Sequence, residues 1–416
     1  MRTLFTGLAL FLFTSGQLFG QGALSPGAGP APVMRSLDQI EPRILIHELP
    51  YTITESGAYA LAGPLQASGT GITVAAHRVT LDLQGFQISG VGSGTGIEVQ
   101  DVSGVSIRNG ILDNFGIGVQ MTNASAGRLE HLTVSNSASQ GILIAAQDGD
   151  SLGNQLRNLS LQNSGGPGLG LEAGENGRVI GNIIMQVQIS DSGSNGLRLR
   201  AAGGEVSGNL IRNTRVSGTA NFSGVDLLSD SGGRVQGNLM EQLQVTQNSH
   251  SGLRMMAFGA DTITTGNVLR NSTITGNGNQ IPALSVQGLS GGAANGNLIE
   301  GSKISQNAQS GINFNQTGSG STRGNLVRNS QISDNAGTGI SLDPGVQGTR
   351  IQDNQISGHA TGISAGSTGS LVFRNVFFNH SGNAITQISA DNIIAPTPTA
   401  VGTIPTSTNA WSNFSF

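Results

Sequence analysis

The sequence predicts an all-β fold, a parallel β-helix in which short strands stack coil upon coil. The first observation is a repeat that opens with Gly-Asn at positions 153, 181, 208, 237, 266, 296 and 324. The intervals between these positions are 28, 27, 29, 29, 30 and 28 residues. A period in this range is typical of solenoids, whose repeats bury their apolar faces only against their neighbours.

The second observation is that apolar residues recur in fixed columns of the repeat. Two positions after each Asn the residue is always apolar, as in Leu156, Ile184, Ile211, Met240, Leu269, Ile299 and Val327. A second column follows five positions later, and a third run places large apolar residues at i and i+2. Polar neighbours flank the second column, and alternation with period 2 indicates strands with one face inward. Three short strands per repeat, with no helical stripe, predict a three-sided parallel β-helix.

The recurring Gly-Asn-x-Ile-x-Asn, Ile-x-x-Asn and Gly-Ile-x-Leu runs resemble the repeats of right-handed parallel β-helix proteins of the pectin lyase-like fold, including secreted bacterial members without an assigned function. The resemblance covers roughly residues 70–390 and implies eleven or twelve right-handed coils. It implies no single activity, because this architecture serves lyases, hydrolases, epimerases, adhesins and proteins of no known activity.

Composition narrows the class of protein. Charged residues make up 11% of the chain and the net charge is −4, which argues against both a disordered chain and a general nucleic-acid binder. The chain has no cysteine, so it has no disulfide framework and no thiolate metal site.

The N-terminal residues predict export. Arg2 precedes an apolar run over 4–13, which is typical of a signal peptide, here assigned to residues 1–22. A membrane anchor is the alternative, but the run is short for a bilayer span. Residues 23–42 are rich in Gly, Ala and Pro and predict a flexible linker. We expect a secreted or bacterial envelope protein, at the outer surface or in the periplasm, with no membrane span after signal removal.

The remaining boundaries follow from the pattern. Residues 43–70 are predicted as an N-terminal cap, 71–390 as the parallel β-helix and 391–416 as a C-terminal cap whose aromatic residues seal the core. The central coils gain Gly/Ala/Ser-rich turns, as over residues 201–207. Asp82 lies between two leucines and is expected to face solvent.

Outward charged residues on the third strand are the candidate ligand-binding positions: Glu172, Arg198, Arg200, Asp226 and Arg254. Glycoside hydrolysis requires two carboxylates near one bond, and only Asp226 is central. The Asp-Asp and Gly-His-Gly runs of pectin hydrolases are missing, so no catalytic residue is assigned. No two of the six histidines have metal-ligand spacing, and Asp148 with Asp150 predicts a turn rather than a calcium site. We therefore expect no metal and no cofactor.

Three further rows repeat from coil to coil. The first row alternates in charge and consists of Arg212, Glu241, Arg270, Glu300 and Arg328. It predicts a ladder of ion pairs between neighbouring strands, with a binding site for an acidic polysaccharide as the alternative. The Asn of each Gly-Asn predicts a stack of side-chain amides at a corner. The aliphatic residue after that Asn, from Ile183 to Leu326, forms a row that we expect to be buried beneath the Gly-rich turns, with a self-association surface as the alternative.

The sequence favours a non-catalytic, monomeric protein with a structural or surface-binding role and a polysaccharide or cell-surface glycan as partner. The alternative is a carbohydrate-active enzyme, namely a polysaccharide lyase, hydrolase or epimerase. The two differ in whether outward carboxylates converge in a groove.

Overall fold

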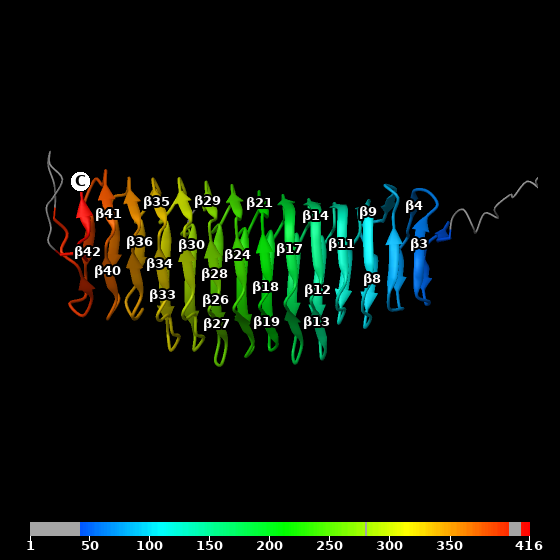
Figure 1. The fold of residues 1–416 in the computed structure, drawn as a ribbon, viewed down its shortest axis with the longest axis horizontal. Helices are drawn as coiled ribbons and strands as arrows, with labels where there is room; N and C mark the ends of the chain where they lie inside the picture. Colours follow the sequence, from blue (N-terminus) through cyan, green and yellow to red (C-terminus); the bar gives the residue numbers. More distant parts are fainter. Residues whose placement is uncertain (1–41, 279–280, 399–408) are drawn as a thin grey trace, which may run out of the picture. The chain divides into compact units, whose positions relative to one another are not determined.

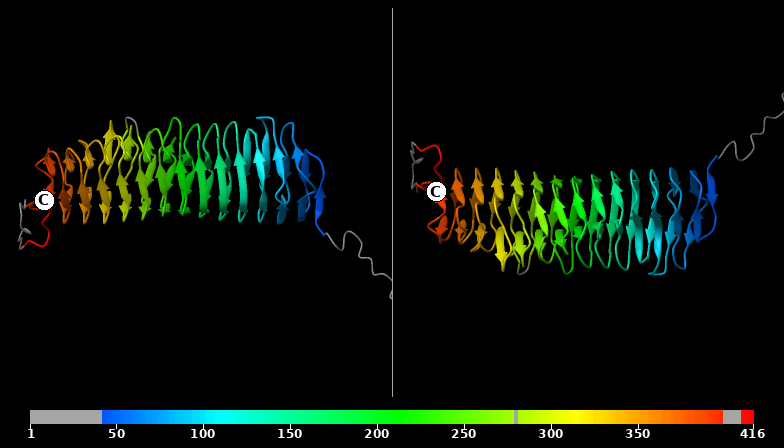
Figure 2. Two further views of the ribbon diagram at one scale, coloured as in Figure 1. Left: turned by 90° about the horizontal axis from the view of Figure 1, so that it is seen from above. Right: turned by 90° about the horizontal axis from the view of Figure 1, so that it is seen from below.

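The computed structural model describes residues 42–278, 281–398 and 409–416. The chain divides into the units Met1–Pro42 and Arg43–Phe416, and the described strands all lie in the second. The predicted signal peptide and nearly all of the predicted linker are outside the described residues. Within these residues there is no helix, and hence none long and apolar enough to cross a membrane. In the second unit the coils stack side by side in chain order (Figure 1), as two opposite views also show (Figure 2).

One side of the solenoid is a 14-stranded sheet in which strands of successive coils pair in parallel. The regular solenoid has about 11 turns, as expected, and short strands of the end coils complete the sheet. Its strands are β2 (Tyr51–Ile53), β5 (Ile72–Val74), β8 (Thr95–Gln100), β10 (Ile117–Thr122), β12 (Ile142–Ala146), β15 (Leu169–Ala173), β18 (Leu197–Ala202), β22 (Val225–Asp230), β26 (Leu253–Phe258), β30 (Leu284–Leu289), β33 (Ile312–Thr317), β36 (Ile340–Leu342), β39 (Ile363–Ala365) and β42 (Ile385–Gln387).

A 25-stranded sheet forms two further sides, which we call its first and second limbs. Four long strands run through both limbs: β9 (Ser106–Asp113), β11 (Arg128–Ser135), β14 (Gln155–Gln162) and β17 (Ile183–Ser190). The other strands of the first limb are β1 (Ile44–Ile46), β3 (Gly57–Leu61), β6 (Val79–Asp82), β20 (Leu210–Arg212), β24 (Leu239–Glu241), β28 (Val268–Arg270), β31 (Leu298–Glu300), β34 (Leu326–Arg328), β37 (Arg350–Gln352), β40 (Leu371–Phe373) and β43 (Ile393–Ile394). Those of the second limb are β4 (Leu65–Gln66), β7 (Gln87–Ser89), β21 (Arg215–Ser217), β25 (Gln244–Thr246), β29 (Thr273–Thr275), β32 (Lys303–Ser305), β35 (Gln331–Ser333), β38 (Gln355–Ser357), β41 (Val376–Phe378) and β44 (Phe414–Ser415).

The central coils have a fourth side that the sequence did not predict. The supposed Gly/Ala/Ser-rich turns contain a five-stranded sheet, formed by β13 (Asp150–Leu152), β16 (Arg178–Ile180), β19 (Glu205–Ser207), β23 (Arg234–Gln236) and β27 (Ile263–Thr265). The middle residue of each of these strands is buried. In some strands it is a valine, such as Val206, and in the others it is a small polar residue. The six residues of the aliphatic row, from Ile183 to Leu326, are mostly buried within the chain, as expected, although the supposed turns form a sheet of their own.

The interior is filled by the predicted apolar columns. Ile189, for example, is 1% exposed, and the corresponding residues of neighbouring coils are also buried. Asp82 contradicts its expectation, because it is buried rather than solvent-facing. Its carboxylate accepts hydrogen bonds from Arg108 Nε at 3.1 Å and from Asn109 Nδ2 at 3.2 Å, so a charged neighbour from the next coil replaces the solvent.

The predicted stack of amides is confirmed at the corner that precedes the first limb. The Asn238 side chain is fully buried and its Nδ2 donates to Asn267 Oδ1 at 2.9 Å and to the carbonyl oxygen of Val206 at 3.1 Å. The same pattern links Asn154, Asn182, Asn209, Asn238, Asn267, Asn297 and Asn325. Each side chain thus satisfies backbone groups that the corner leaves without a strand partner.

A second amide stack, not predicted from the sequence, lies after the second limb and ends on a histidine. Asn248, Asn277, Asn307 and Asn335 hydrogen-bond in series, and Asn335 Nδ2 donates to His359 Nε2 at 3.2 Å. His359 is 3% exposed and stacks on His380 with ring centroids 5.7 Å apart. Burial, aided by the nearby His380, lowers the pKa of His359 to about 4.

Candidate functional site

The five predicted ligand-binding residues lie on adjacent strands of the 14-stranded sheet. Glu172 on β15 is paired with Arg200 on β18 in the strand register, and Arg198 is followed in the next two coils by Asp226 and Arg254. We call these five residues the charged cluster. The strand register thus places all five residues on one sheet, and their ligand-binding role stays a prediction.

The charged cluster is held together by ion pairs within the chain. Arg198 Nε donates to Glu172 Oε1 at 3.1 Å, and Gln140 Nε2 donates to the same oxygen at 2.6 Å. Arg200 Nε donates to Asp230 Oδ2 at 2.8 Å, a partner the sequence did not single out. That hydrogen bond raises the pKa of Arg200 despite the opposing effect of burial.

Asp226 and Arg254 form the most buried pair of the charged cluster. Arg254 donates from Nε to Asp226 Oδ1 at 2.7 Å and from Nη2 to Oδ2 at 2.8 Å, and the Asp226 side chain is 2% exposed. Burial acts to lower the pKa of Arg254, but the hydrogen bonds and charge of Asp226 raise it above its ordinary value. Both carboxylate oxygens of Asp226 accept hydrogen bonds from Arg254, so this carboxylate stabilises Arg254 rather than facing a ligand.

The geometry of the charged cluster does not resemble a paired-carboxylate hydrolase site. Glu172 and Asp226 lie two coils apart and two strand positions out of line, a backbone separation of about 12 Å at ordinary strand spacings. Paired catalytic carboxyl groups lie about 5–10 Å apart and face one bond, whereas here Glu172 is bound by Arg198 and Asp226 by Arg254. A shallow pocket of about 180 Å³ opens beside Glu172 and Arg200 on this face. The charged cluster could therefore bind polar groups, but it offers no matched acid and base.

The alternating row of the first limb is an ion-pair ladder. Arg212 and Glu241 are 3.3 Å apart, while Glu300 contacts Arg270 at 3.0 Å and Arg328 at 2.7 Å. The structural interpretation of this row is thus supported. Asp150 of the predicted turn pairs with Arg178 at 2.6 Å. Over the described ranges, no group of three acidic or histidine side chains is arranged to hold a metal ion.

A groove that the sequence did not reveal follows the bend between the two limbs. At the bend, one residue per coil has a positive φ, for example Gln186 (56°), Asn213 (49°), Gln242 (56°) and Asn271 (49°). Asn tolerates this left-handed conformation better than most residues, whereas Gln adopts it less readily. The column of such residues turns every coil in the same direction, so the bends align into a continuous depression.

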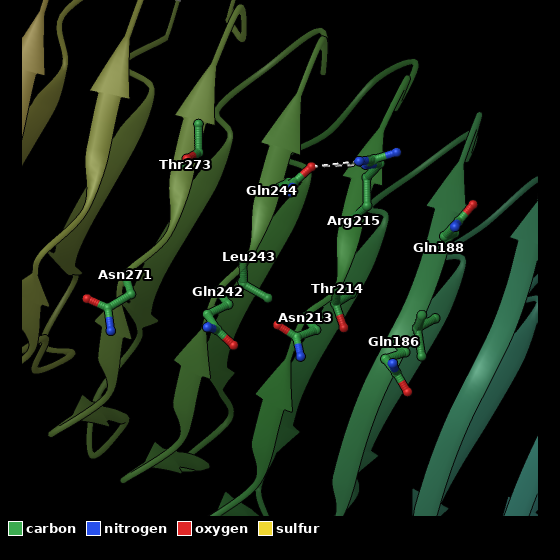
Figure 3. Close-up of a pocket in the computed structure, with 11 residues that line it drawn as sticks. Gln186, Gln188, Asn213, Thr214, Arg215, Gln242, Leu243, Gln244, Asn271 and Thr273 are labelled. Carbon is green, nitrogen blue, oxygen red and sulfur yellow. Dashed lines mark hydrogen bonds between the residues drawn. The ribbon is translucent and has the colours of Figure 1, made fainter.

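Polar side chains line this depression in two parallel rows, shown in Figure 3. The bend supplies Gln186, Asn213, Gln242 and Asn271, and the second limb supplies Gln188, Arg215, Gln244 and Thr273. We call these eight residues the amide groove. Its volume is about 500 Å³, within the range of ligand sites, and its floor includes the buried Val187, Thr214 and Leu243.

The amide groove escaped sequence analysis because its outward residues are ordinary strand and corner residues when taken singly. The signal that could have found it is the run of amides directly after the ion-pair row or its equivalent, at 186, 213, 242 and 271. Only the bend angle brings that column close to the next outward column. Contacts across coils order the groove, since Arg215 donates to Gln244 Oε1 from Nε at 3.1 Å and from Nη2 at 2.8 Å.

Comparisons with known proteins address the fold. A family model described as right handed beta helix region matches residues 66–211 and 195–394. The solved A-module of Azotobacter vinelandii mannuronan C-5 epimerase AlgE6 is 14% identical, covers 82% of this chain and 90% of its own, and has a TM-score of 0.54. A GH87 alpha-1,3-glucanase catalytic domain in complex with nigerose is 13% identical over 84% of this chain and 63% of its own, with a TM-score of 0.47. No curated protein is similar in sequence at a significant level.

Proposed function

Because the chain belongs to the right-handed β-helix family, we propose that it binds a polysaccharide in the amide groove, with one sugar residue against each coil. The observation that carries the proposal is the repetition of hydrogen-bonding side chains across four successive coils. In-register parallel strands repeat at about 4.8 Å, which is close to the length that one sugar residue adds to an extended polysaccharide. Amide side chains both donate and accept hydrogen bonds, as the hydroxyl groups of a sugar require.

The lining of the groove favours a binding role over catalysis. The residues around it are amides, hydroxyls, aliphatics and one arginine, with no carboxylate and no histidine to act as acid or base. The epimerase and the glucanase named above are carbohydrate-active proteins by name, but their low identity relates them to this chain in fold alone. We place the protein outside the cytoplasm, supported by the apolar run after Arg2.

A carbohydrate-active enzyme is the second candidate, and the charged cluster is the observation that favours it. Glu172 is half-buried at the edge of a pocket, with Arg198 and Arg200 close by. An arginine can stabilise negative charge that develops on a substrate, and a carboxylate can accept a proton. If the protein is an enzyme, the charged cluster takes part in converting the substrate and does not only bind it.

One experiment separates these versions. Binding to a panel of neutral and acidic oligosaccharides is measured by calorimetry, and reducing ends, unsaturated products and epimerised residues are followed in parallel. The double variant Gln188→Ala/Gln244→Ala should weaken binding at least tenfold, while Gln287→Ala on the 14-stranded sheet should leave it unchanged. Product formation that stops in Glu172→Gln but survives the double variant would support the enzyme instead. The absence of binding to every glycan would refute the proposal.

A further inference from the structure

The charge around the amide groove differs from that of the whole chain. The net charge of the chain is −4. Yet the outward row of the second limb has two cations and no carboxylate over seven coils, in the order Gln188, Arg215, Gln244, Thr273, Lys303, Gln331 and Gln355. The acidic residues closest to it in sequence are Asp353, which pairs with Arg374, the ladder residues Glu241 and Glu300, which pair with arginines of the first limb, and Asp191 and Asp334, which lie beyond the second limb. The row therefore carries positive charge that its own strands do not cancel.

Arg215 is distinguished by its partner. Several other arginines pair with carboxylates, such as Arg254 with Asp226 and Arg178 with Asp150. Arg215 is exposed, forms no ion pair among the described residues, and is held by the neutral amide of Gln244. A neutral acceptor fixes the orientation of the guanidinium but leaves its charge available, which is the arrangement needed to bind an anion.

The first limb adds to this positive field on the other side of the bend. Its ladder contains three arginines and two glutamates, which leaves one positive charge after pairing. Arg212 also reaches the groove, since its Nε donates to Gln242 Oε1 at 3.1 Å. The groove thus lies between a row with two uncancelled cations and a ladder with one excess cation.

A row of hydroxyl groups borders the cationic row. Seven consecutive coils place Ser or Thr in register at the last position of the second-limb strand: Ser190, Ser217, Thr246, Thr275, Ser305, Ser333 and Ser357. The first four of these residues are partly exposed. Because hydroxyl groups donate and accept hydrogen bonds at each coil step, this row provides contacts that repeat with the same spacing as the amides.

We propose that the ligand of the amide groove is an anionic polysaccharide, with carboxylate or sulfate groups that face Arg215 and Lys303. This inference rests on the function proposed above and specifies its ligand class. The two cations are three coil steps apart, about 14 Å, so one extended chain contacts both. The amides and hydroxyls bind the sugar hydroxyls, and the cations select for charge, because a neutral chain gains nothing from them.

The test uses the full chain with three probes: dextran, dextran sulfate and polygalacturonate, measured by calorimetry at several NaCl concentrations. Dextran and dextran sulfate share one backbone, so their difference isolates the charge, and polygalacturonate distinguishes carboxylate from sulfate. We expect at least one acidic probe to bind tenfold or more tightly than dextran, and its affinity to fall with added salt. Arg215→Gln/Lys303→Gln should reduce that affinity at least tenfold. Arg234→Gln, which removes an exposed arginine from the five-stranded sheet, should not.

The outcomes separate this inference from the proposed function. If dextran binds as tightly as both acidic probes and salt has no effect, the anionic class is wrong while polysaccharide binding stands. Acidic probes that bind equally to wild type and to Arg215→Gln/Lys303→Gln place the site elsewhere and overturn the inference. If none of the probes, nor any glycan of the wider panel, binds, the proposed function itself fails. Circular dichroism of each variant checks that the solenoid remains folded.

Discussion

Truncation of one buried amide tests how much the corner stack contributes to stability. In Asn238→Ala, the backbone N–H of Asn209 loses its acceptor, Asn238 Oδ1, at 3.0 Å. Three further hydrogen bonds of the side chain disappear, to Asn209 Nδ2, Asn267 Oδ1 and the Val206 carbonyl oxygen. A buried donor without a partner costs about 1–3 kcal/mol, and each lost bond costs about 1 kcal/mol where its partners find no substitute. Since some partners retain other bonds, we expect a total loss of about 4 kcal/mol.

Hydrogen exchange is the appropriate assay, because a solenoid can open coil by coil and a single global transition can hide a local loss. The reporter is the amide of Leu210, whose own hydrogen bond to the Asn182 carbonyl oxygen (2.9 Å) is not altered by the substitution. A loss of about 4 kcal/mol corresponds to roughly thousand-fold faster exchange. Gln331→Ala, at an exposed position of β35, should change the exchange less than threefold. If Asn238→Ala also stays within threefold, the amide stack contributes no local stability and the reasoning is wrong.

Three other substitutions test the core, a buried ion pair and a titrating group. Ile189→Asp places a charge without a partner in a column that is 1% exposed and should unfold the central coils, so a melting temperature close to that of wild type would refute its inward position. Asp226→Ala should cost about 3 kcal/mol because it leaves Arg254 unpaired, whereas Asp226→Leu/Arg254→Met should cost less in chemical denaturation; equal costs would contradict the pairing argument. The pKa of His359 is about 4 in the folded chain and near 6.5 when unfolded. Protonation of this histidine therefore favours the unfolded chain. The free energy of unfolding is unaffected by His359 above pH 6.5 and falls by about 3 kcal/mol as the pH drops to 4. His359→Asn should flatten the stability profile in that window, and an unchanged slope would show that another group titrates there.

The sequence predicts the strands and the buried amide stack well because both depend on one residue type that recurs at the same position of each repeat. Leu156 and its equivalents face inward in every coil, and the Asn after each corner glycine satisfies the same backbone groups each time. The fourth side was missed because residues 205–207 lie among glycines and alanines and were interpreted as a turn. Asp82 was misplaced because its partner Arg108 comes from the next coil, a contact that local alternation does not reveal.

For the two candidate sites as well, the sequence predicts some features and misses others. The positions of Glu172, Arg198 and Asp226 on one face follow from strand alternation, but their ion pairs depend on side-chain reach across coils. The amide groove depends on the angle of the bend at residues such as Asn213, which results from backbone torsion rather than from residue type. The sequence pattern indicates which face of a strand a side chain occupies, but it does not indicate the angle at which two sides of the solenoid meet.

The corner stack also has an evolutionary consequence. The junctions from Asn154 to Asn325 use the same asparagine contact, made to the coil before and the coil after, so one of these coils is chemically interchangeable with another at that corner. Duplication or loss of a whole repeat would rejoin matching ends and require no new interface. Such a chain can change its length in evolution in units of one coil, and a binding surface that repeats with the coils would lengthen or shorten in step.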